Sequence, residues 1–154
     1  MTEKQMKKVG EVLAFSESYL VLLDKANIAA RFLWNDDTLS SIVQTHKGLI
    51  TEIKTIAQSF PDSEVVTEKA SKTKDKLLSM AEMYIKDEWD NPTELLEWLG
   101  FFSGAAIVHW ALVAGIADAN KLATLLPLTQ HALATWNETF DFVKTELYET
   151  GKRK

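Results

Sequence analysis

Three histidines are the side chains of this sequence best suited to acid–base or metal chemistry, because the chain has no cysteine. His46 and His109 both fall on apolar stripes of segments with helical spacing, so they could approach each other inside a helical bundle. Glu17 and Asp24, in the first segment, could add carboxylate oxygens to such a pair. The sequence therefore offers one candidate metal site, made of His46, His109, Asp24 and Glu17.

A second interpretation explains the same positions without any chemistry. A buried, neutral imidazole that is hydrogen-bonded to a backbone carbonyl would also sit on an apolar stripe. The Glu-x-x-His pairs of di-iron bundles are missing, since Val43, Ala106 and Leu128 stand three positions before the histidines. The sequence also lacks a nucleophile elbow and a glycine-rich phosphate loop. It therefore indicates no catalytic residue and no cofactor, and leaves open whether the protein is an enzyme.

Aromatic residues supply a second candidate site. The chain has five tryptophans, and Trp98, Phe102, Trp110 and Trp136 could line an apolar pocket between helices. Pockets in that position of a bundle bind small ligands. The competing interpretation is that aromatic side chains at helical spacing simply fill the core.

Prolines and capping residues divide the chain into helices that must position these side chains. All three prolines fit helix boundaries, and Asn91-Pro92 combines an N-cap residue with a proline suited to the first helical position. Between these boundaries, apolar residues recur at alternating three- and four-residue steps. The predicted helices cover about residues 3–34, 38–60, 63–89, 92–117 and 125–148.

This spacing predicts an all-α fold, an antiparallel bundle of about five helices in a single domain over residues 1–154. The fourth predicted helix is apolar on every side, so it must be surrounded. Gly100 and Gly104 would let a neighbouring backbone approach it closely. We expect this helix at the centre of the bundle, ringed by the other four. In an alternative arrangement, its second face is buried in a symmetric dimer.

A membrane span is the competing explanation for the apolar segment 95–117, which is long enough to cross a hydrocarbon core. His109 near its middle, the lack of basic flanking residues and four amphipathic companion helices argue against this interpretation. The first residues of the chain also lack the apolar core of a signal peptide. We therefore expect a soluble, cytoplasmic protein.

Charge limits the partners. The chain carries 17 basic and 22 acidic residues, and its lysines and arginines are scattered, so nucleic acid is not an expected partner.

The sequence favours a non-enzymatic helical protein that acts through protein–protein contacts, as an accessory or regulatory homodimer. The alternative function is a metal- or small-molecule-binding bundle, with or without enzyme activity, that uses His46 and His109. A small membrane-associated protein is the third alternative.

Overall fold

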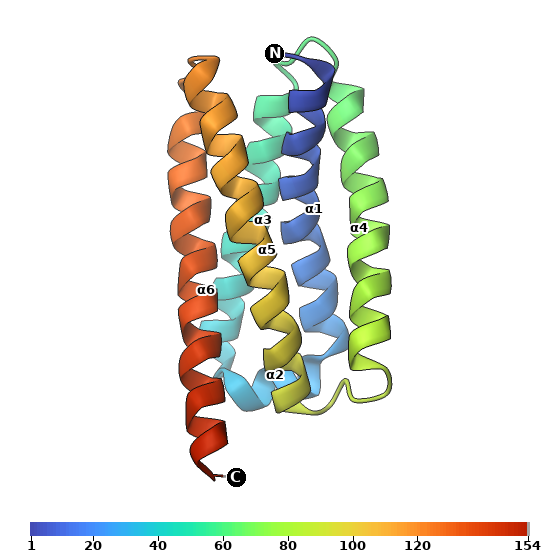
Figure 1. Cartoon of the computed structure of the whole chain (residues 1–154), viewed down its shortest axis with the longest axis vertical. Helices are drawn as coiled ribbons and strands as arrows, with labels where there is room; N and C mark the ends of the chain where they lie inside the picture. Colours follow the sequence, from blue (N-terminus) through green and yellow to red (C-terminus); the bar gives the residue numbers. More distant parts are fainter. Residues whose placement is uncertain (154) are drawn as a thin grey trace.

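The computed structural model describes residues 1–153, and helices make up almost all of this part of the chain (Figure 1). The helices are α1 (Glu3–Lys25), α2 (Asn27–Leu33), α3 (Asp36–Ala57), α4 (Ser63–Ile85), α5 (Pro92–Ala119) and α6 (Leu125–Arg153). The five long helices run alongside one another, whereas α2 crosses one end of the bundle. The prediction of an all-helical bundle is confirmed.

The sixth helix arises from a break in the first predicted one. At Ala26 the backbone leaves the helical region, with φ −96° and ψ 30°, and α2 starts at the next residue. The Ala26 amide still donates to the Leu22 carbonyl at 2.8 Å, so the break leaves this amide satisfied. Neither glycine nor proline marks the position.

Local capping by asparagine fixes the starts of α3 and α5. The Asn35 side chain accepts a hydrogen bond from the Thr38 amide at 2.8 Å and begins α3. The Asn91 side chain accepts from the Thr93 amide at 3.0 Å and begins α5. The third predicted helix is shorter than expected, because Lys86 takes φ 58° and ends α4 at Ile85.

Helix α1 packs against α3, α4 and α5, and at Gly10 it lies against the backbone of α4. A Cβ atom at this position would lie 2.6 Å from the Val66 carbonyl oxygen and 2.9 Å from Cβ of Lys69. Real atoms do not approach so closely, so the two helices need a residue without a side chain at Gly10. This contact sets the separation of α1 and α4.

Helix α5 contacts α1, α2, α4 and α6, yet one of its sides is uncovered. Phe101, Val108 and Leu112 on that side are 64%, 63% and 48% exposed. The arrangement in which this helix is ringed by the others is therefore not the one observed, because no helix lies over these three residues. Within residues 1–153, α5 is also the one helix long and apolar enough to cross a membrane, judged by length and composition alone.

Candidate functional site

The two histidines of the candidate metal site lie in different surroundings. His46, on α3, is buried and packs against the rings of Tyr19 and Trp136, with both centroid distances at 4.8 Å. His109, on α5, is partly exposed and lies 5.3 Å from the ring of Phe15. Its Nδ1 is 2.7 Å from the carbonyl oxygen of Ala105, one turn earlier in the helix. This is the carbonyl-bonded arrangement of the second interpretation, although the ring is not fully buried.

The carboxylates expected beside them also lie elsewhere. Glu17 is 3.9 Å from the ammonium group of Lys54 on α3, and Asp24 is exposed to solvent. Among the residues that the structure describes, no group of three histidine, aspartate or glutamate side chains could hold a metal ion. The expected convergence of His46, His109, Asp24 and Glu17 is therefore not formed.

The four aromatic residues of the candidate ligand pocket are core residues. Trp98, Phe102, Trp110 and Trp136 are buried, and Phe102 lies 6.1 Å from Trp98 and 5.6 Å from Trp136 between ring centroids. None of them lines the pocket described next. Their arrangement fits the core interpretation of these residues.

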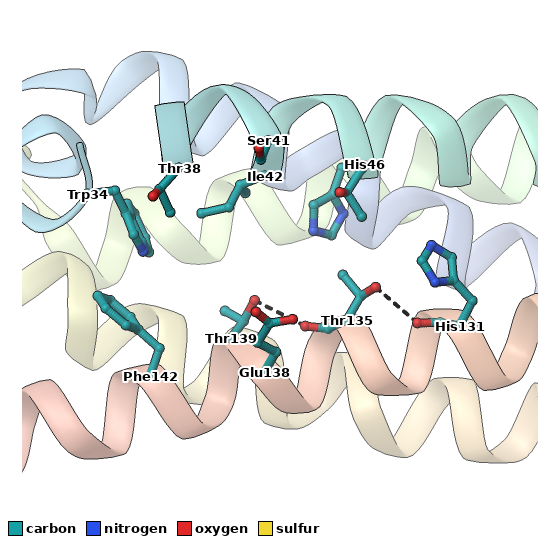
Figure 2. A pocket seen from close by; sticks show the side chains of 11 residues that line it. Trp34, Thr38, Ser41, Ile42, His46, His131, Thr135, Glu138, Thr139 and Phe142 are labelled. Atoms are coloured by element: carbon teal, nitrogen blue, oxygen red, sulfur yellow. Dashed lines mark hydrogen bonds between the residues drawn. The ribbon is translucent and has the colours of Figure 1, made fainter. Parts of the chain in front are cut away.

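A pocket of about 410 Å³ lies between α3 and α6 (Figure 2). Its apolar end is formed by Ile42 and by the rings of Trp34 and Phe142, which stack with centroids 5.1 Å apart. At its polar end the imidazole of His46 points from α3 toward α6, and His131 stands on α6 at the edge. His131 is exposed to solvent.

The buried imidazole of His46 has one hydrogen-bond partner. Its Nδ1 lies 3.0 Å from the hydroxyl oxygen of Ser16, which is also buried, whereas its Nε2 has no partner among the described residues. Two effects together lower the pKa of His46 to about 3: burial, because the charged ring would lose its hydration, and, to a smaller extent, the charge of the nearby His131. His46 is therefore neutral at physiological pH.

The hydrogen bond between Ser16 and His46 has two possible directions, set by which ring nitrogen carries the proton. If the Ser16 hydroxyl donates to Nδ1, the proton of the neutral imidazole is on Nε2, and that N–H group has no acceptor. If Nδ1–H donates to Ser16, the hydroxyl proton of Ser16 has no acceptor instead. In both cases one buried donor is unpaired, an arrangement that costs about 1–3 kcal/mol.

Two other side chains near His46 also have a buried polar atom without a hydrogen-bond partner. The Tyr19 hydroxyl is buried and makes no hydrogen bond of normal geometry, and burial raises its pKa, an effect that the Thr139 side chain partly offsets. The indole nitrogen of Trp136 is likewise unpaired. Three neighbouring side chains therefore hold unused polar atoms between α1, α3 and α6, beside the pocket. Buried polar groups without partners are uncommon in folded proteins.

The rim of the pocket is polar and carries neither lysine nor arginine. Hydroxyl groups of Thr135 and Thr139 donate to backbone carbonyls of α6, at 2.9 Å and 3.4 Å, which leaves their lone pairs free to accept. Glu138 is exposed at the rim, and neither lysine nor arginine is found among the described residues that line the pocket. The site therefore suits a neutral molecule better than an anion.

A second candidate surface is the uncovered side of α5 together with the adjoining side of α4. We call it the α5 face, and its exposed members are Met80, Met83, Tyr84, Phe101, Val108 and Leu112. The rings of Tyr84 and Phe101 lie 5.4 Å apart and join the two helices into one surface. Contiguous apolar patches on a protein surface mark contact sites more often than chance.

Sequence reasoning identified His46 but missed Ser16 and Tyr19, which surround it. Both lie on α1, about thirty residues earlier in the chain, and no local spacing links them to His46.

Comparison of the chain with protein-family models, with curated proteins and with solved structures finds no match. The interpretation of both candidate sites therefore depends on their own geometry.

Proposed function

We propose that this protein acts through protein–protein contacts made by the α5 face, and that a second copy of the chain is its partner. The observation that carries this proposal is the exposure of Phe101, Val108 and Leu112 along one side of a helix whose other sides are packed. Covering such a row with protein removes apolar surface from water, worth about 25 cal/mol per Å². An isologous contact needs only this one surface, used twice.

Small residues beside the row favour a helix as the covering element. Ala111 and Gly115 are exposed on the same helix, and a Cβ atom at Gly115 would meet nothing within 4 Å. A helix from another molecule could therefore approach the backbone of α5 closely there. The same chain offers this helix with the same small residues.

Charge and geometry favour protein over lipid as the covering material. Glu94 and Glu97 lie near the start of α5 and Asp118 near its end, whereas a surface that binds anionic lipids carries lysine and arginine at its edges. A spanning helix also needs lipid or apolar protein on every side, but the other sides of α5 belong to a bundle with many charged surface residues. A soluble, aqueous setting is part of this proposal.

A pair of valine variants tests the proposal. Val108→Lys places a charge in the centre of the α5 face, while Val21→Lys places the same charge at an exposed valine of α1. Val21 lies one turn after Glu17, on the side of α1 that faces Lys54 of α3. Sedimentation velocity over a range of concentrations should show a dimer for the unmodified protein and for Val21→Lys, and a monomer for Val108→Lys.

Two results would contradict the proposal. One is an unmodified protein that stays monomeric at concentrations far above those in cells. The other is co-sedimentation of the unmodified protein with phosphatidylcholine vesicles that is lost in Val108→Lys, which would make lipid the covering material. Thermal melts of all three proteins should agree within a few degrees, since both substitutions are at exposed positions.

A further inference from the structure

We propose that the pocket between α3 and α6 binds a neutral small molecule with an apolar ring and a carbonyl or amide oxygen, which accepts a hydrogen bond from Nε2 of His46. This site shares no residue with the α5 face, so the inference does not depend on the function proposed above. Its chemistry follows from three features of the pocket: an unpaired ring nitrogen, the absence of lysine and arginine, and a flat apolar end.

The unpaired Nε2 of His46 is the first feature. His46 is 1% exposed, its Nδ1 is occupied by Ser16, and its Nε2 has no protein partner (Figure 2). A ligand oxygen that accepts from Nε2 lets Ser16 donate to Nδ1, so both protons of this pair find an acceptor. A ligand that donates to Nε2 would leave the Ser16 proton unpaired. Because Nε2 is shielded from bulk water, the ligand must displace a lining side chain to reach it. Thr135 and Thr139 are suitable, since each is a short side chain held by one hydrogen bond.

Charge is the second feature and selects a neutral ligand. A carboxylate or phosphate would enter a pocket that is lined by the Glu138 carboxylate, with no lysine or arginine to balance the two negative charges. A cation could approach Glu138 at the rim, but it would place positive charge against the donor at Nε2. A neutral amide satisfies both ends, because its oxygen accepts from His46 and its N–H groups can donate to Glu138 or to a threonine oxygen.

The apolar end is the third feature and selects a ring. Trp34 and Phe142 stack with their planes 26° apart, and together with Ile42 they form a flat apolar wall. The cavity volume, about 410 Å³, lies in the range of pockets that bind small organic molecules. Thr38 and Ser41 at its edge are exposed, so a ligand can enter without separating the helices.

Three probes of the same shape and different charge test the proposal: benzamide, benzoate and benzamidinium. Nitrogen-15 labelling of the histidines resolves His46 from the other two rings, and its Nε2 signal is followed while each probe is added. We expect a saturable shift with benzamide, with a dissociation constant on the order of 1 mM for so small a molecule. Benzoate and benzamidinium should bind at least about tenfold more weakly, a difference of about 1.4 kcal/mol in binding free energy.

Variants of two histidines assign the effect to the proposed atom. His46→Phe keeps a ring in the core but removes the donor, and His131→Phe is its matched control at the exposed edge. Fluorine-labelled benzamide, followed by its own resonance, should lose saturable binding with His46→Phe and keep it within about twofold with His131→Phe. If His46→Phe does not fold, Thr135→Trp, which fills the pocket from the α6 side, should abolish binding instead.

Several outcomes would overturn the proposal. Equal binding of all three probes would show that charge does not select the ligand. Tighter binding of benzamidinium would show that the site prefers a cation. A His46 signal that does not move with benzamide, or that moves without saturating, would mean that the pocket holds only water. A proton on Nδ1 instead of Nε2 in the protein with benzamide bound would contradict the proposed hydrogen bond.

Discussion

At the scale of single residues, His46 links the stability of the fold to pH. Its ring is neutral in the folded protein, where burial lowers its pKa to about 3, whereas the unfolded chain has the ordinary value of 6.5. Between these two values the unfolded state binds more protons than the folded state. Protonation therefore favours unfolding, and the contribution of His46 to stability is lost as the pH falls below about 6.

We expect the free energy of unfolding to fall with decreasing pH between about 6 and 3, with His46 contributing up to about 1.4 kcal/mol per pH unit. Urea unfolding at a series of pH values measures this slope. His46→Gln, which cannot take up a proton, should show a smaller slope over the same range. Identical slopes for the two proteins would contradict the lowered pKa.

Only the contacts of a histidine with residues near it in the chain could be predicted from the sequence. The contact of His109 with the carbonyl of Ala105 spans one helical turn, so local spacing is enough to suggest it. The contact of His46 with Ser16 joins two helices, and serine is too common a residue for its position to indicate a partner. The four residues of the predicted metal site do not lie together for the same reason. A position on an apolar stripe indicates that a side chain points inward, but not which side chains of other helices it meets.

At the scale of the helices, the separation of α1 and α4 depends on one missing side chain. Gly10→Ala would force the Val66 carbonyl and the backbone of Ala70 away from α1, because the added Cβ would lie 2.6 Å and 3.2 Å from them. We expect a net loss of about 1–2 kcal/mol in the free energy of unfolding, since overpacking outweighs the better helix propensity of alanine.

Gly48→Ala is the matched control on α3, where a Cβ atom would meet nothing within 4 Å. That substitution should raise the free energy of unfolding by about 0.5–1 kcal/mol through helix propensity alone. Chemical denaturation of the two variants measures both effects. The same sign for both variants would mean that Gly10 is not at a close contact.

The end of α4 offers a further prediction. Lys86 takes φ 58° and ψ −111°, a backbone conformation that glycine adopts without the strain felt by other residues. Lys86→Gly should raise the free energy of unfolding by about 1 kcal/mol, measured by urea denaturation. Lys76→Gly, in the interior of the same helix, should lower it by a similar amount.

Helix boundaries could be predicted where a capping residue marks them and not elsewhere. Asn35 and Asn91 each cap a helix with their own side chains. Residues next to the helix start are therefore enough to indicate where it begins. The break at Ala26 has no such signal. Beyond the break, α2 packs against α5 and α3, and local spacing does not contain such tertiary contacts.

At the scale of the whole molecule, the sequence indicates that its most apolar helix must be covered, but not what covers it. Because α5 is apolar on every side, its sequence contains no pattern that indicates which side packs and which remains free. The structure packs its other sides against α1, α2, α4 and α6 and leaves Phe101, Val108 and Leu112 uncovered. The bundle could be predicted, but the α5 face could not.

The absence of cysteine allows a direct measurement of the central proposal, that a second copy covers the α5 face. A single cysteine in place of Ala111, which is exposed beside Val108 and Leu112, can form a disulfide only with another molecule. Under mild oxidation at micromolar concentration, Ala111→Cys should become a covalent dimer within minutes. Ala134→Cys, at an exposed position of α6, should remain a monomer under the same conditions. Equal rates of cross-linking for the two variants would contradict the proposed contact.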